Sequence, residues 1–126
     1  MSKAKIVLGK LGEKLAVDFL QSQGYRIWHK NYRTKLGEVD IIAQDKDTVS
    51  FIEVKTRSSE SKGTAQEAIS ARKQRAMAKA ALVFLKDKNL LDRRARFDVV
   101  SIMYTDGEPC VEILKDAFEL DSSFTY

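Results

Sequence analysis

The stretch Lys35–Arg57, KLGEVDIIAQDKDTVSFIEVKTR, decides the fold, because it has the pattern of a β-hairpin. Its first strand, Glu38 to Ala43, is apolar apart from two acids. Residues 44–47 (QDKD) are all polar, as expected of a turn that joins two strands. The second strand, Thr48 to Thr56, is rich in β-branched and aromatic residues, which is typical of a central strand. We therefore expect this hairpin to lie within the core sheet.

Two carboxylates and one ammonium group are predicted to lie on one face of this hairpin. Glu53 and Lys55 are two residues apart, so they share a face of their strand. A simple register about the turn brings Asp40 close to Glu53 across the strands. Buried carboxylates that lie this close repel each other and cost several kcal/mol unless a cation neutralises them. Proteins commonly hold Mg²⁺ with one or two carboxylates, water and substrate phosphate, so the pattern predicts a divalent metal site.

The composition sets limits on the class of protein. The 126 residues suffice for one hydrophobic core, so we expect residues 1–126 to form a single domain. No apolar run approaches the roughly 20 residues of a membrane span, and the N-terminal stretch lacks the apolar segment of a signal peptide. The single cysteine, Cys110, rules out an internal disulfide and suits a reducing cytoplasm. The net charge of +4 is weak evidence for a polyanionic partner.

A first helix is predicted from Ala4 to Gln23, because apolar residues recur there at helical spacing. Glu13 lies at the edge of the buried face of this helix. Two interpretations stay open for it. Its carboxylate can reach solvent or a nearby lysine from the edge of the apolar stripe. Alternatively, it is a third acid directed toward Asp40 and Glu53.

The rest of the chain supplies further strands and a second long helix. The predicted elements are a strand over Tyr25–Arg33, a loop over Ser58–Gly63, a helix over Thr64–Lys88, strands over Phe97–Tyr104 and Val111–Leu114, and an irregular tail over 115–126. The helix start is placed at Thr64 because Glu67 follows it with the spacing of a capping box. Together these elements predict an α/β fold with a mixed central sheet of about five strands, flanked by two long helices in the order α-β-β-β-α-β-β.

A lysine interrupts the apolar face of the second predicted helix. Lys73 lies four residues from both Ile69 and Met77. Its stem can cover apolar surface while its ammonium group reaches water. In the functional interpretation Lys73 faces a phosphate, and Arg72 and Arg75 beside it strengthen a positive rim.

Three other polar residues carry weaker signals. Asp98 begins the fourth predicted strand, where it either adds an acid to the site or, as we prefer, caps the strand or pairs with a neighbouring arginine. His29 and Cys110 are far apart in the sequence and no acid is identifiable to orient the histidine, so they do not predict a thiol hydrolase. Neither has the spacing of a Cys/His metal site.

Several short motifs together resemble a known family. They are Gly12-Glu13-x-x-Ala16, Gly37-Glu38-x-Asp40, Phe51-x-Glu53-Val54-Lys55-x-Arg57, Lys73, and Arg96-Phe97-Asp98. With them the chain, from about Gly9 to Leu114, resembles the UPF0102 (YraN-like) family of small bacterial proteins, which looks like a branch of the PD-(D/E)xK restriction-endonuclease-like superfamily. The proline that usually precedes the first acid of that superfamily is absent, since Glu38-Val39 stands before Asp40. Within that superfamily, the resemblance implies a fold similar to that of archaeal Holliday-junction resolvases.

The resemblance implies a metal-dependent endonuclease with a restriction-endonuclease-like core. It assigns metal binding to Asp40 and Glu53, the catalytic lysine to Lys55 and a further catalytic acid to Glu13. The implied cofactor is Mg²⁺ or Mn²⁺. The residues expected to contact nucleic acid are Arg57, Arg72, Lys73 and Arg75.

The partners follow from the same resemblance. DNA is the expected substrate, with branched or junction DNA as one candidate and RNA as the alternative nucleic acid. Because the archaeal resolvases work as dimers, a homodimer is also expected, and a membrane is not. The alternative function is a nucleic-acid-binding or scaffold protein that keeps the nuclease fold without cleaving.

Overall fold

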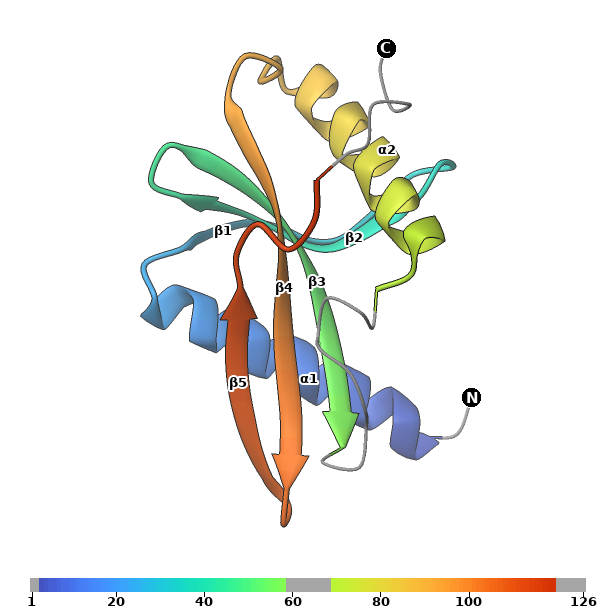
Figure 1. Cartoon of the computed structure of the whole chain (residues 1–126), viewed down its shortest axis with the longest axis vertical. Helices are drawn as coiled ribbons and strands as arrows, with labels where there is room; N and C mark the ends of the chain where they lie inside the picture. The colour runs from blue at the N-terminus through green and yellow to red at the C-terminus, as the bar shows by residue number, and fades with distance from the viewer. Residues whose placement is uncertain (1–2, 59–68, 120–126) are drawn as a thin grey trace.

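The computed structural model describes residues 3–58 and 69–119, and its elements follow the predicted order (Figure 1). These elements are helix α1 (Lys3–Ser22), strands β1 (Arg26–Arg33), β2 (Glu38–Asp45) and β3 (Thr48–Ser58), helix α2 (Ala71–Asp87), and strands β4 (Arg94–Thr105) and β5 (Glu108–Leu114). The predicted α/β class, with a five-stranded mixed sheet and two helices, is confirmed.

The sheet has the strand order β1-β2-β3-β4-β5. Strands β1, β2 and β3 form an antiparallel meander, and β4 and β5 form a second hairpin. Strands β3 and β4 are parallel, because the chain crosses over between them through α2. The meander places the Lys35–Arg57 hairpin inside the sheet, as predicted. Its turn is tighter than predicted, because Gln44 and Asp45 pair with Val49 and Thr48 and so extend β2.

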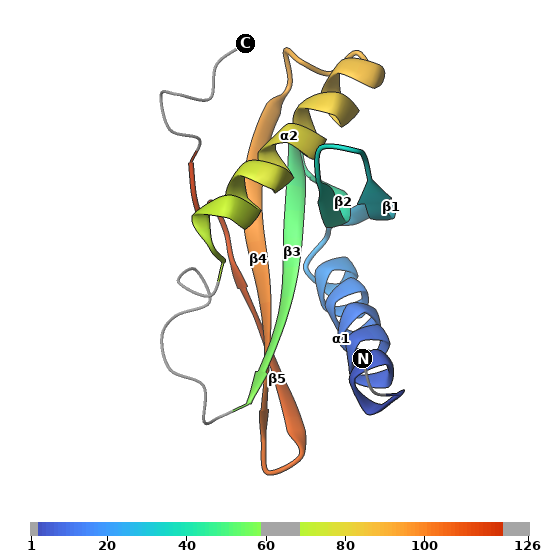
Figure 2. The ribbon, with the colours of Figure 1, turned by 90° about the vertical axis from the view of Figure 1, so that its right-hand side faces the viewer.

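The two helices cover opposite faces of the sheet (Figure 2). Ile52 and Val54 of β3 pack in the cluster beneath α1, whereas Phe51 packs beneath α2. This alternation sends Glu53 toward α2, where it meets Lys73. The prediction that Glu53 and Ile52 face opposite sides of the sheet is confirmed.

Helix α2 begins later than predicted. Ser70 is its N-cap, with an extended backbone (φ −62°, ψ 156°) and a side chain that accepts a hydrogen bond from the Lys73 backbone N–H. The predicted start at Thr64 is wrong, because the helix begins at Ala71 after this cap. The Thr64 and Glu67 pattern, like the predicted loop beyond Ser58, lies outside the described residues.

A buried ionic cluster ties β2, β3 and β4 to the segment after β5. Asp98 is fully buried and accepts hydrogen bonds from Arg96 Nε (2.8 Å), from the Asp116 backbone N–H (2.8 Å) and from the Ser50 hydroxyl. Arg96 also donates to Asp45 (2.9 Å), at the end of β2. The interpretation that Asp98 pairs with a neighbouring arginine is confirmed, so its role is structural.

The segment after β5 packs on the body of the domain. The Ala117 N–H donates to the Phe97 carbonyl (2.7 Å), and the Phe118 ring stacks on the Phe97 ring at a centroid distance of 4.8 Å. The predicted irregular tail beyond residue 119 lies outside the described residues. None of the helices in the described part of the chain combines the length and apolar character that a membrane crossing requires.

Candidate metal-binding site

Asp40 lies where strands β2 and β3 separate. Their backbone ladder runs from Asp45 opposite Thr48 to Ile41 opposite Ile52. The same register continued by one residue sets Asp40 against Glu53, as the sequence predicted. Here the Val54 backbone N–H donates to the Asp40 carboxylate oxygen Oδ2 (2.8 Å). The Asp40 side chain thus accepts a hydrogen bond from the β3 backbone at the point where the ladder ends.

The Glu53 carboxyl group is buried beside Asp40. Its side chain is only 11% exposed, and its Oε2 has no hydrogen-bond partner among the described residues. Burial and the neighbouring Asp40 charge raise the pKa of Glu53 to about 7. Burial also raises the pKa of Asp40, although the hydrogen bond from Val54 opposes this rise. Both carboxyl groups therefore resist ionisation unless a cation stands close to them.

Two lysines approach these acids from the same side of the sheet. The Lys73 Nζ lies 3.7 Å from Glu53 Oε2 and 3.5 Å from Glu38 Oε1. Lys55 is half-buried on the Glu53 face of β3, and its charge lowers the pKa of Glu53 against the larger effect of burial. The structure therefore gives Lys73 a contact that neither interpretation of the sequence contained, because its ammonium meets two carboxylates.

Glu38 is a member of this cluster that the site prediction left out. Its carboxylate contacts Arg33 (3.5 Å) as well as Lys73. The signal available in the sequence was its position two residues before Asp40, within the motif Gly37-Glu38-x-Asp40. What could not be foreseen from the sequence is its ion pair with a helix 35 residues further along the chain.

Glu13 lies apart from this cluster. It belongs to α1, which covers the opposite face of the sheet, and its Oε1 accepts a hydrogen bond from Asn31 of β1 (2.8 Å). Within the described residues, no group of three or more Asp, Glu, His or Cys side chains is placed to hold a metal ion. The structure therefore brings together Asp40, Glu53 and the two lysines, and the catalytic role of Glu13 stays a prediction.

The remaining predicted residues flank the site. Arg72 and Arg75 are exposed near the start of α2, and Arg57 is half-buried near the end of β3. Their predicted contacts with nucleic acid stay predictions.

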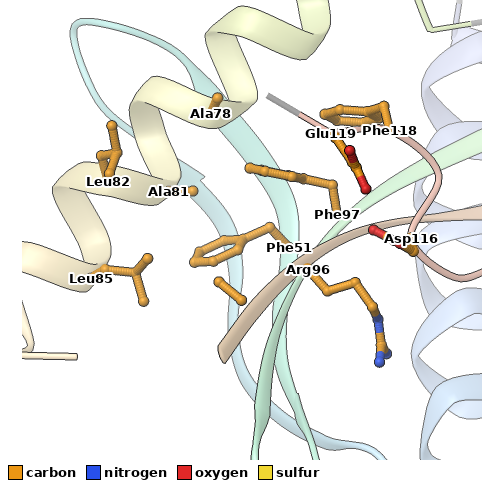
Figure 3. A pocket seen from close by; sticks show the side chains of 11 residues that line it. Phe51, Ala78, Ala81, Leu82, Leu85, Arg96, Phe97, Asp116, Phe118 and Glu119 are labelled. Carbon is orange, nitrogen blue, oxygen red and sulfur yellow. The ribbon is translucent and has the colours of Figure 1, made fainter. Parts of the chain in front are cut away.

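A separate hollow of about 330 Å³ lies between α2, β4 and the segment after β5 (Figure 3). It is lined mainly by apolar side chains, and none of the predicted site residues lines it. Figure 3 shows the Arg96 guanidinium directed away from the rings of Phe97 and Phe118, which agrees with its place in the buried ionic cluster. The hollow is therefore distinct from the acid pair.

The fold and the site define an α/β protein with an acid pair, the buried Glu53 and the half-buried Asp40, and two lysines on one face of a mixed five-stranded sheet. Residues 12–102 match the model of a family described as "Uncharacterised protein family UPF0102". The chain is 51% identical over 114 residues to a UPF0102 protein of Geotalea uraniireducens, which covers 90% of each chain. It is 46% identical over 112 residues to one of Syntrophus aciditrophicus (89% and 88% covered) and 43% identical over 122 residues to one of Trichlorobacter lovleyi (95% and 96% covered). The chain belongs to the UPF0102 family, as its motifs indicated.

The raised pKa of Glu53 predicts how stability changes with pH in metal-free buffer. The folded protein keeps the Glu53 proton up to about pH 7, whereas the unfolded chain releases it near 4.5. Between these values the folded state binds more protons, so its stability falls as the pH rises. We expect the parent protein to lose on the order of 3 kcal/mol more than Glu53→Gln between pH 4.5 and 8.

Urea unfolding at a series of pH values measures this difference. Glu112→Gln, an exposed carboxylate on β5, is the matched control and should follow the parent. Parallel profiles for the parent and Glu53→Gln would contradict the expected burial of this carboxyl group.

Proposed function

We propose that this protein is a divalent-metal-dependent endonuclease that hydrolyses phosphodiester bonds of DNA. The observation that carries the proposal is the acid pair where β2 and β3 separate, formed by the half-buried Asp40 and the buried Glu53, with Lys55 on the Glu53 face of β3. The resemblance of the motifs to the PD-(D/E)xK superfamily supports the same chemistry, because it assigns metal binding and catalysis to these three residues.

The residues present fit Mg²⁺ or Mn²⁺. Both groups are carboxyls, the hard oxygen ligands that these ions prefer. Burial disfavours their ionised forms, and Glu53 Oε2 has no hydrogen-bond partner among the described residues. A dication beside them would remove both penalties. Two protein carboxylates leave room for water and substrate phosphate, as is usual for Mg²⁺.

Each residue then has a defined role. Asp40 and Glu53 would hold the ion, which supplies a Lewis acid and a bound water molecule of lowered pKa. The hydrogen bond from Val54 fixes the Asp40 carboxylate in advance. Glu53 would have to be ionised to act as a ligand, and the positive charge of the ion would favour that form. The Lys55 ammonium would stabilise negative charge that develops on the phosphate.

Basic side chains around the acid pair would position the nucleic acid. Arg57, Arg72 and Arg75 are the proposed phosphate contacts, since guanidinium groups bind phosphate oxygens in pairs of hydrogen bonds. The resemblance to archaeal resolvases makes four-way junctions the first structured substrate to test, with RNA as the alternative polymer.

A cleavage assay tests the proposal. Linear, flapped and four-way DNA are incubated with the protein in Mg²⁺ or Mn²⁺, and the parent should cleave at least one of them. Asp40→Asn, Glu53→Gln and Lys55→Met should each lower the rate by about a hundredfold or more. Asparagine is chosen at position 40 because its amide oxygen can still accept the Val54 hydrogen bond.

The control for the assay is Glu112→Gln, which removes an exposed carboxylate of β5 and should leave the rate unchanged. Absence of metal-dependent cleavage of every substrate by the folded parent protein would refute the proposal.

One observation favours a second function, a nucleic-acid-binding protein that does not cleave. Lys73 already supplies an internal cation to the acids, so the cluster can persist as an ion-pair network. In that case DNA binding would survive Asp40→Asn and Glu53→Gln and would fall steeply with salt, because phosphate contacts alone would hold the DNA. A scaffold protein would bind no nucleic acid and would retain a protein partner.

A further inference from the structure

The Lys73 ammonium is a positive charge that would compete with a metal ion for Glu53. Its ammonium lies 3.7 Å from Glu53 Oε2, the oxygen atom that has no hydrogen-bond partner among the described residues. The Lys73 side chain is 30% exposed, so it lies partly beneath the surface while its flexible stem allows its ammonium to move. An ammonium and a dication repel each other. Loading of the acid pair therefore requires the Lys73 charge to leave Glu53.

Glu38 provides the place to which that charge can go. Its Oε1 lies 3.5 Å from the same Lys73 Nζ, so a small movement of the ammonium away from Glu53 leaves it paired. The Glu38 side chain is 49% exposed, in contrast to 11% for Glu53. The more hydrated carboxylate can keep the lysine while the buried one takes the ion.

We propose that Lys73 is the internal counter-cation of the metal-free acid pair and that Glu38 accepts its ammonium when a divalent ion binds. The inference rests on the proposed metal-dependent function and adds two positioning residues to it. Neither residue has to touch the ion. Lys73 weakens metal binding because its ammonium competes with the ion for Glu53. Glu38 strengthens metal binding because it holds that ammonium away from Glu53.

The contacts of Glu38 argue against a direct role as a metal ligand. Its carboxylate is shared between Lys73 and Arg33, two cations that would have to give it up. It also forms no three-acid group with Asp40 and Glu53 that could hold a metal, as judged over the described residues. The geometry therefore points to an effect that Glu38 exerts through Lys73.

A double-mutant cycle on Mn²⁺ binding tests the inference, with isothermal titration calorimetry of the full chain and no nucleic acid present. Lys73→Met keeps the bulk of the stem and removes the charge, and we expect it to tighten Mn²⁺ binding by about tenfold, mid-range for coupled neighbouring groups. Glu38→Gln should weaken binding by about threefold, since Lys73 then stays on Glu53. The double variant should bind like Lys73→Met to within about twofold.

Two further variants serve as controls. Lys73→Arg retains a competing cation and should not tighten binding. Lys79→Met removes the same charge from the same helix, but Lys79 is exposed beside Lys86 and Leu82 and contacts neither acid. It should change the affinity by less than about twofold. A cooperative thermal unfolding transition, measured for every variant, would show that each one is folded.

The outcomes separate this inference from the proposed function. If the parent binds Mn²⁺ and Lys73→Met binds no tighter than Lys79→Met, the counter-cation role is overturned while the metal site stands. If Glu38→Gln weakens binding equally with methionine at position 73, Glu38 does not act through Lys73. If no variant binds Mn²⁺, both proposals fall. If the substitutions at positions 38 and 73 are coupled in Mn²⁺ binding but the protein cleaves no DNA, the inference stands and the proposed nuclease function is overturned.

Discussion

Asp98→Asn is expected to lower the free energy of unfolding by about 3 to 5 kcal/mol, the usual cost of removing one partner from a buried ion pair. Asp98 is fully buried, and its carboxylate accepts hydrogen bonds from Arg96, Ser50 and the Asp116 backbone. The amide would turn an N–H group toward donors that need an acceptor. It would also leave the Arg96 guanidinium, whose side chain is 20% exposed, with Asp45 as its remaining ion-pair partner in the cluster.

Urea unfolding at pH 7 measures this loss. The same carboxyl-to-amide change at Glu112, which is exposed on β5, is the control and should cost less than about 0.5 kcal/mol. A cost at Asp98 as small as that at Glu112 would show that the ionic cluster does not hold β2, β3 and β4 together. The expected effect separates Asp98 from the acid pair, since Glu53→Gln should preserve or increase stability near neutral pH.

Gly37→Ala is expected to destabilise the protein by about 3 kcal/mol, at the upper end of the usual cost of overpacking. Gly37 stands just before β2, against the backbone of α2. A Cβ atom there would lie 2.1 Å from the Ala76 carbonyl oxygen and 2.6 Å from its carbonyl carbon. Backbone atoms cannot rotate away as a side-chain end can, so the strand and the helix have to separate.

The same substitution at Gly9 is the matched control. Gly9 lies within α1, and a Cβ atom there meets nothing within 4 Å. Gly9→Ala should therefore stabilise the protein by about 0.5 to 1 kcal/mol through helix propensity. Opposite signs at the two glycines, measured by urea unfolding, are the expected result. A neutral Gly37→Ala would mean that α2 can shift without cost, and hence that Lys73 is only loosely held over Glu38 and Glu53.

The hairpin is the part of the fold that could be predicted most fully. The alternation of apolar and polar residues along 48–56 assigned Ile52 and Glu53 to opposite faces, and a polar turn fixed the register. The faces and the register both follow from the local pattern, because shifting the strand pairing by one residue would bury the polar side of the strand. The element order followed from the same kind of evidence.

The start of α2 shows where local pattern misled the prediction. Both Thr64 and Ser70 carry side chains that can cap a helix, and the capping-box spacing of Glu67 favoured the earlier position. The structure has its cap at Ser70. Single-residue capping preferences are worth only about 1 kcal/mol, so they cannot by themselves choose between two candidates in one stretch.

Contacts between distant parts of the chain could not be predicted from the sequence. The pairing of Lys73 with Glu38 joins the start of α2 to the start of β2, and Arg96 with Asp45 joins β4 to the end of β2. Each depends on how the crossover places α2 or β4 beside the meander. Glu13 illustrates the converse. One of the two interpretations of its place on the helix directed it toward the acids, whereas its side chain contacts Asn31 of β1.

The hydrogen bond from the Val54 N–H to the Asp40 carboxylate means that natural selection acts differently on the two acids. The Asp40 side chain accepts a hydrogen bond from the β3 backbone and also supplies a carboxylate to the site. Selection for a stable fold and selection for a working site therefore favour the same residue at position 40. Glu53 is buried, and its Oε2 has no hydrogen-bond partner among the described residues, so its carboxyl group lowers the stability of the fold. The trade-off between stability and activity that is common at functional sites thus falls on position 53. A lineage that no longer needed the site would be expected to replace Glu53 first and to keep Asp40 longer.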